Sequence, residues 1–90
     1  MAKRIALRAK LRQRQQGRCC YCRTPMTPSM MSTKKVKPLP TSETLEHLHR
    51  IVEGGTSRAD NLALACHRCN IERGGIDWLT YASYRRGEIA

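Results

Sequence analysis

The chain contains no phenylalanine, and its aromatic residues are limited to one tryptophan, Trp78, and three tyrosines. The core must therefore be built from Leu, Ile, Val and Ala. Ninety residues also bury only a modest fraction of the surface that the unfolded chain exposes. We expect one small domain that needs a metal ion, disulfides or a partner to hold it together.

Acidic residues are absent before Glu43. Residues 1–42 carry eleven Lys and Arg, whereas residues 43–90 carry six basic and seven acidic residues. The formal net charge of +10 therefore comes from the N-terminal part of the chain. A one-sided basic segment is typical of proteins that bind a polyanion, most often nucleic acid. The alternative is a solvated basic arm without a specific partner.

The sequence also lacks a hydrophobic run long enough to span a membrane, and its N-terminus lacks the apolar stretch of a secretory signal. We therefore expect a cytoplasmic protein without a membrane partner. In a reducing compartment, Cys-x-x-Cys units usually bind metal and do not form disulfides. The odd number of cysteines, five, also argues against a closed set of disulfides.

Local patterns predict a single domain over residues 1–90 that begins with a basic N-terminal helix in segment 1–18. Good helix formers fill residues 3–16, and Gly17 is a suitable residue to end the helix. Segment 24–42 contains all four prolines and is predicted to be a loop, with residues 30–36 as a weak candidate for a β-pair.

The C-terminal part predicts a ββα unit over residues 44–75, followed by a helix in segment 76–90. Residues 44–52 alternate loosely, which favours a strand or an extended loop, and a short apolar run at 61–65 favours a second strand. A helix is expected from Cys66 to Arg73, where a glycine pair ends it. Asp77 is suited to cap a last helix over residues 78–86, whose aromatic face is expected to pack on the domain.

Two cysteine pairs give the strongest chemical signal. Cys19-x-x-Cys22 and Cys66-x-x-Cys69 have the spacing of the two halves of a tetrahedral, structural zinc site. Such a site would close a loop of about forty residues and supply folding free energy that the thin core lacks. Cys20 is interpreted as a spare thiol, and its use in place of Cys19 is the alternative assignment.

A second group of polar residues is suited to phosphodiester hydrolysis. This reaction needs a base to activate water and a cation to offset charge on the phosphate. His47 suits the base because the unperturbed pKa of histidine lies near neutrality, and Glu46 suits a hard cation such as Mg²⁺. Asn61 is placed to hydrogen-bond the backbone of the turn that carries them, and Asn70 follows the second cysteine pair directly.

Together with Gly54-Gly55 and Asp60-Asn61-Leu62, these motifs resemble those of the HNH endonucleases, over roughly residues 8–75. The resemblance implies a small α+β fold with a ββα-metal core, stapled by a structural zinc and flanked by N- and C-terminal helices. It implies that His47 is the general base and that Glu46 and Asn70 bind the catalytic divalent ion. Asn61 would brace the loop, and the four paired cysteines would bind the structural zinc.

Three departures from the family pattern bear on the metal. The last motif position is often histidine but is Asn70 here, the acidic position is often aspartate but is Glu46, and a proline common after the histidine is missing. Because the asparagine carbonyl is a hard ligand, the catalytic ion is expected to be Mg²⁺ or Mn²⁺. His49 could substitute as a ligand, whereas His67 is expected on the surface of the zinc helix or near phosphate.

DNA is the expected partner, and the basic helix is expected to contact backbone phosphates without reading sequence. The residues predicted to bind nucleic acid are Arg8, Lys10, Arg12, Arg14 and Arg18, with Lys34, Lys35 and Lys37 adding to them. Two other functions remain open: a non-catalytic, zinc-stabilised nucleic-acid-binding module, and a zinc-stabilised protein-interaction module of a phage or mobile element. The sequence favours no particular oligomeric state.

Overall fold

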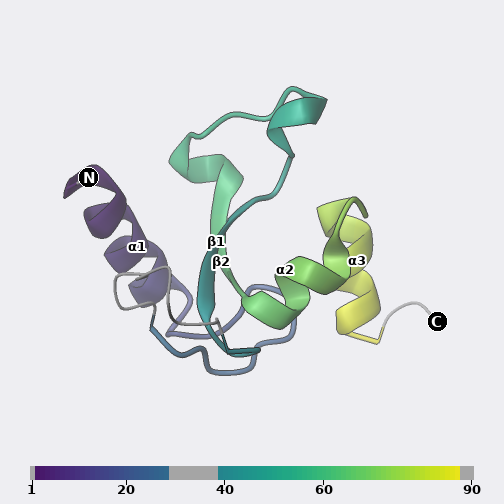
Figure 1. Ribbon diagram of the computed structural model, residues 1–90, viewed down its shortest axis with the longest axis horizontal. Coiled ribbons are helices and arrows are strands. Elements are labelled where there is room, and N and C mark those ends of the chain that lie inside the picture. The colour runs from purple at the N-terminus through teal and green to yellow at the C-terminus, as the bar shows by residue number, and fades with distance from the viewer. Residues whose placement is uncertain (1, 29–38, 88–90) are drawn as a thin grey trace.

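A computed structural model describes residues 2–28 and 39–87 and shows a small α+β fold (Figure 1). The elements follow the order α1 Ala2–Arg14, β1 Glu43–His47, η1 Ile51–Glu53, η2 Ala59–Asn61, β2 Leu62–Cys66, α2 His67–Arg73 and α3 Trp78–Arg85, where η marks a 3₁₀ turn. The predicted ββα unit is present with a helix on each flank. The possible β-pair at residues 30–36 and the three loop lysines lie outside the described residues.

The two strands pair antiparallel, with Leu45 opposite Leu64 and His47 opposite Leu62. The predicted extended stretch over 44–52 is therefore too long, because β1 ends at His47. Beyond His47, the Asn61 side chain hydrogen-bonds both backbone groups of His49. Its Oδ1 accepts from the His49 N–H at 2.9 Å, and its Nδ2 donates to the His49 carbonyl at 3.0 Å. A side-chain amide thus replaces the next strand pair, and the chain bends into η1.

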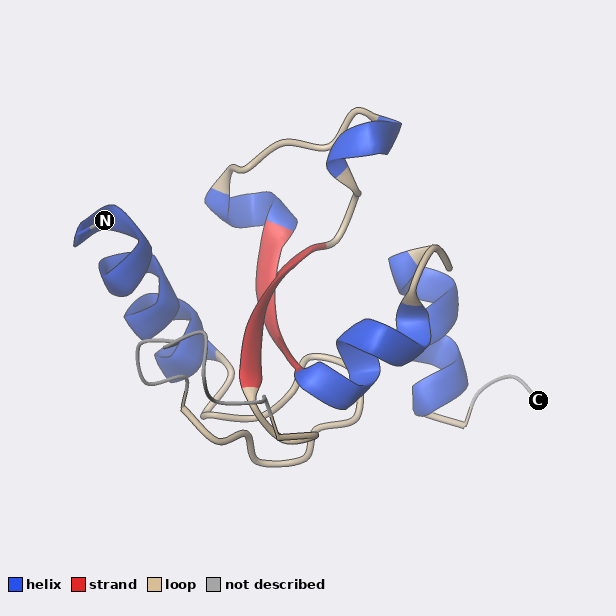
Figure 2. Ribbon diagram, in the orientation of Figure 1, coloured by secondary structure: helices blue, strands red, loops and turns tan. Residues whose placement is uncertain are grey.

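Apolar side chains form two clusters on the sheet, one on the side of α1 and one on the side of α2 and α3. Leu11 of α1 packs with Leu62 and Leu64, and the half-buried Leu45 joins them. The other cluster contains Ala65, two tyrosines and three buried cysteines. Figure 2 shows the same arrangement, with α1 on one side of the strands and α2 and α3 on the other.

Helix α1 is fixed to the sheet by polar side chains as well as by Leu11. Gln15 binds the outer edge of β2: its Oε1 accepts from the Leu64 N–H and its Nε2 donates to the Leu64 carbonyl, both at 2.8 Å. An edge strand otherwise presents such groups unpaired. The helix ends at Arg14, two residues before the predicted end, and Gly17 adopts the left-handed conformation with a φ of 71°.

Side chains cap the N-terminal ends of α2 and α3. The Cys66 sulfur accepts from the Cys69 N–H at the start of α2, and Gly74 follows its last residue. Asp77 caps α3, as predicted, because its Oδ2 accepts from the Thr80 N–H at 3.2 Å. Trp78 is half-buried and packs against the cluster on this side of the sheet. No helix in the described parts of the chain is long and apolar enough to cross a membrane.

Candidate metal centre and active site

The four paired cysteines meet in one place, although they come from two segments more than forty residues apart. Cys19, Cys22, Cys66 and Cys69 have all their sulfur atoms within 4.8 Å of one another. The sulfur atoms of Cys22 and Cys66 lie 3.9 Å apart. A tetrahedral zinc ion with Zn–S bonds of about 2.3 Å would set its sulfur atoms about 3.8 Å apart. The cluster therefore fits a four-coordinate metal ion such as zinc.

Polar neighbours of this cluster favour charged sulfur. The backbone N–H groups of Tyr21 and Cys69 point to the sulfurs of Cys19 and Cys66, at 3.4 and 3.5 Å. From α3, the Arg85 guanidinium hydrogen-bonds Cys22, and this contact raises the pKa of Arg85. One guanidinium thus offsets part of the charge that four thiolates would bring together.

Cys20 lies next to the cluster but is not part of it. The Cys20 thiol hydrogen-bonds the sulfur of Cys19, and mainly for this reason the pKa of Cys19 falls to about 4. The same hydrogen bond, together with burial, raises the pKa of Cys20. The geometry therefore places Cys19, and not Cys20, in the metal cluster.

Glu46 is the best-connected carboxylate of the candidate catalytic site. It is only 8% exposed, and its Oε1 lies 3.2 Å from Nη1 of Arg73, which is itself 3% exposed. Its Oε2 accepts from the Tyr21 hydroxyl at 3.4 Å. Burial raises the pKa of Glu46, and this effect exceeds the opposing effects of Arg73 and Tyr21. The carboxylate thus already has one cation beside it.

Two contacts set the position of α2 along β1. The Asn70 Nδ2 donates to the Thr44 hydroxyl at 3.0 Å, and one turn later Arg73 contacts Glu46. Thr44 and Glu46 lie on the same face of β1 because side chains alternate along a strand. Arg73 is therefore the α2 residue opposite Glu46, and Asn70 lies opposite Thr44, two residues earlier on β1. The Nδ2 of Asn70 is in use, which leaves its carbonyl oxygen Oδ1 as the atom able to face a cation.

His47 is the last residue of β1 and points to the face opposite Glu46. Its ring is half-buried, and its Nε2 lies 3.4 Å from the hydroxyl of Ser57. The His47 backbone is fixed from the other side, because the Arg73 Nη1 donates to its carbonyl at 3.1 Å. The structure therefore joins His47 and Glu46 through the backbone and Arg73, without direct contact between their side chains.

The loop after His47 is closed by Asn61. Besides its two bonds to His49, the Asn61 Nδ2 donates to the Thr56 carbonyl at 2.7 Å. Gly55 allows this closure, because a Cβ at that position would lie 1.9 Å from the His49 carbonyl oxygen. The hydrogen bonds that the sequence predicted for Asn61 are thus present, and its part in catalysis remains a prediction. His49 is exposed and meets Trp78 edge-on, with ring centroids 6.5 Å apart.

The predicted nucleic-acid-binding residues fall into two groups. Arg8 and Arg12 contact the buried carboxylate of Glu43, and Arg12 does so through two hydrogen bonds of 2.8 and 2.7 Å. Burial raises the pKa of Glu43, but the bonds from Arg12 outweigh it and the pKa is lowered. These two arginines therefore hold α1 to β1. Lys10, Arg14 and Arg18 are exposed.

Two residues of this site, Tyr21 and Arg73, were not predicted from the sequence. The Tyr21 hydroxyl also accepts from Nη1 of Arg73 at 3.2 Å, so that one contact joins the cysteine turn to Glu46. A signal was available for Arg73: it lies three residues after Asn70, on the same helical face. Tyr21 sits between two candidate zinc ligands, a position that predicts proximity to the metal but not to Glu46.

Comparisons with known proteins agree with this geometry. The model of the HNH endonuclease family matches residues 19–75, which include both cysteine pairs, Glu46, His47, Asn61 and Asn70. The chain is similar to the CRISPR-associated endonuclease Cas9 of Corynebacterium diphtheriae, with 31% identity over 70 residues. The aligned part is 78% of this chain but only 5% of that protein. No solved structure gives a significant match.

Proposed function

Because the chain belongs to the HNH endonuclease family, we propose that it is a metal-dependent endonuclease that hydrolyses phosphodiester bonds of DNA. The observation that carries the proposal is the family match over residues 19–75 on a ββα unit whose turn after His47 is held at several points. A catalytic base needs such fixed geometry, because small displacements cost much of the rate.

In this proposal, His47 is the general base. Its half-buried ring at the end of β1 has Nε2 near the Ser57 hydroxyl, so it is both oriented and within reach of solvent. A neutral imidazole there can take a proton from the attacking water. Asn61 and Arg73 orient the base through the backbone, from the two sides of the turn.

Glu46 and Asn70 are proposed to hold the divalent ion. A carboxylate has about four acceptor sites, and Arg73 and Tyr21 use two of those on Glu46. The Oδ1 of Asn70 adds a second oxygen donor from the same side of β1. An all-oxygen set suits Mg²⁺ or Mn²⁺, which would offset charge on the scissile phosphate. Arg73 contributes a fixed positive charge beside the same carboxylate.

The four-cysteine cluster is proposed to hold a structural zinc, with no part in the chemistry. A complete tetrahedral set of thiolates leaves no open position for water or substrate. This assignment also supports the proposed location, the cytoplasm, where a reducing environment keeps the thiols available for metal.

A specific observation favours a second candidate, a non-catalytic zinc-stabilised nucleic-acid-binding module. Glu46 is buried and already neutralised by Arg73, which is also the arrangement of a purely structural ion pair. In that case the exposed Lys10, Arg14 and Arg18 would bind DNA, and the turn at His47 would only support the fold.

Cleavage of supercoiled plasmid DNA with and without Mg²⁺ or Mn²⁺ tests the two candidates. The endonuclease proposal expects metal-dependent nicking or linearisation that His47→Ala reduces by about 10²-fold or more while zinc content stays unchanged. Equal cleavage by the wild type and His47→Ala would show that the base is assigned wrongly. Salt-dependent DNA binding by both proteins, with cleavage by neither, would favour the binding module.

A further inference from the structure

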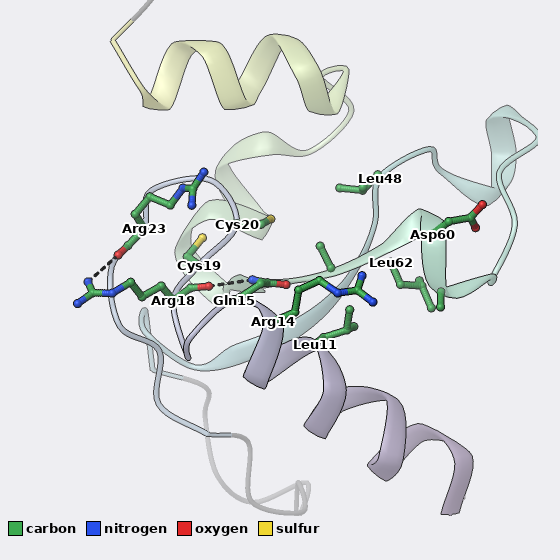
Figure 3. A pocket seen from close by; sticks show the side chains of 12 residues that line it. Leu11, Arg14, Gln15, Arg18, Cys19, Cys20, Arg23, Leu48, Asp60 and Leu62 are labelled. Atoms are coloured by element: carbon green, nitrogen blue, oxygen red, sulfur yellow. Dashed lines mark hydrogen bonds between the residues drawn. The ribbon is translucent and has the colours of Figure 1, made fainter.

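A pocket of about 320 Å³ opens along the outer edge of β2, where α1 ends (Figure 3). Leu11 and Leu62 form part of its apolar lining, and Arg14, Arg18 and Arg23 also line it. Figure 3 shows Arg14 extending over the leucines, with Arg23 at one end of the pocket and Asp60 at the other. Asp60 is the single carboxylate in the lining.

Carboxylates do not neutralise the arginines of this pocket, in contrast to the arginines that hold α1 and α2 to β1. Arg12 and Arg73 are paired with buried glutamates. Among the residues that the structure describes, Arg14, Arg18 and Arg23 take part in no ion pair. Three arginines of the basic N-terminal part that lack an ion pair thus line one pocket.

The wall between these arginines is rigid. The Gln15 side chain bridges Leu64 and the carbonyl of Arg18, with its bond to that carbonyl at 2.8 Å. The Arg18 Nη1 in turn donates to the carbonyl of Arg23 at 3.1 Å, which holds the cysteine turn against the end of α1. Arg14 and Arg23 therefore extend from fixed backbone on opposite sides of the pocket, so that little backbone entropy remains to be lost on binding.

We propose that this pocket binds a backbone phosphate and its sugar from the DNA strand that the protein acts on. A phosphate diester matches guanidinium donors in charge and geometry, and the apolar floor suits the face of a deoxyribose. The lining includes Leu48, which directly follows His47, and Leu62, which pairs with His47 across the sheet. Because of this adjacency, binding here positions the strand relative to His47. The inference rests on the proposed function.

The test is a comparison of two double variants with the same change in charge. Arg14→Gln/Arg23→Gln removes two pocket cations and leaves Arg18, which supports the turn. Arg58→Gln/Arg68→Gln removes two exposed cations outside the pocket. Binding to a short fluorescent DNA duplex is measured without Mg²⁺ over a range of salt concentrations, with zinc content and thermal unfolding as checks on folding.

We expect the pocket variant to bind at least about tenfold more weakly at low salt, with a log–log salt slope shallower by about 1, because one phosphate contact is lost. The control should lose clearly less, and Asp60→Asn should bind more tightly than the wild type. Equal losses in the two double variants would refute the pocket, since only overall charge would then matter.

Cleavage assays on the same proteins separate this inference from the proposed function. If binding depends on the pocket but the wild type does not cut, the pocket stands and the endonuclease proposal falls. If the wild type cuts and the pocket variant binds and cuts like the control, the pocket is wrong and the endonuclease proposal stands.

Discussion

Replacing Arg73 with methionine should lower the free energy of unfolding by about 3–5 kcal/mol, the typical cost of removing one partner from a buried ion pair. Methionine keeps most of the length of the side chain, so the loss comes from polar contacts and not from a cavity. Arg73 donates to or pairs with five groups: the Glu46 carboxylate, the Tyr21 hydroxyl and the carbonyls of His47, Leu48 and Ile76. The variant leaves a carboxylate with 10% side-chain exposure without its cation.

A double-mutant cycle separates the ion pair from the other contacts. Glu46→Met alone should also destabilise, because it leaves the guanidinium without its carboxylate, but the combined Arg73→Met/Glu46→Met variant should be less destabilised than the sum of the single changes. Buried ion pairs replaced as a unit by apolar residues are often close to neutral, so we expect a coupling of about 2–3 kcal/mol. The double variant should still have a lower free energy of unfolding than the wild type, because the bonds from Arg73 to the backbone carbonyls are lost.

Urea unfolding, followed by circular dichroism and by the fluorescence of Trp78 at one fixed free zinc concentration, measures these quantities. Fixed zinc matters because bound metal adds to the apparent stability of the folded state. A total stability of about 5–15 kcal/mol leaves room to measure the single variants only near neutral pH and low temperature. A cost below about 1 kcal/mol for Arg73→Met, or strict additivity in the cycle, would refute the view that Arg73 is the centre of this site.

Three further predictions follow from other contacts. Arg12 lowers the pKa of Glu43, so this pair stabilises the fold above the unfolded pKa of about 4.3, and the stabilisation is lost as pH falls through the folded pKa. Glu43→Gln should therefore lower the free energy of unfolding by about 1–3 kcal/mol at pH 7 and make it less dependent on pH below about 4.5. Denaturant unfolding at several pH values measures both effects. Removing metal with a chelator should abolish the cooperative unfolding transition, and added zinc should restore it. A cooperative transition in metal-free protein would contradict the proposal that a structural zinc is needed for folding. Cys20→Ser should retain about one zinc per chain by elemental analysis, whereas Cys22→Ser should lose it; equal loss would show that the cluster is assigned wrongly.

Features that depend on spacing within a short segment were predictable from the sequence. The spacing within each cysteine pair and the cap at Asp77 involve residues only three positions apart, and the structure has both where expected. The bonds of Asn61 to the turn after His47 were also expected. The end of β1 was predicted too late, because the alternation of side chains along residues 44–52 cannot show that a side-chain amide replaces the backbone partner of the strand. Asn61 makes that substitution from twelve residues away.

Pairings between distant segments were not predictable in the same way. Arg12 and Arg8 were assigned to DNA because the N-terminal part has no acidic residue of its own, yet Glu43 lies beside them in the folded chain. A net charge counted over one segment assumes that its charged residues do not pair with residues of another segment. Docking of α1 on β1 breaks that assumption, and it moves the available positive charge toward the end of the helix.

Tyr21 and Arg73 change how the two candidate metal sites relate to each other. From the sequence, α2 alone joins them, with cysteines in its first turn and Asn70 in the next. In the structure a second connection runs from the cysteine turn through the Tyr21 hydroxyl to Arg73, and from there to Glu46 and the carbonyl of His47. Because both connections start at the four-cysteine cluster, a metal ion bound there would help to fix the positions of His47, Glu46 and Asn70. A thin apolar core cannot hold buried charges in register by itself, and here the four-cysteine cluster and Arg73 add the contacts that do so.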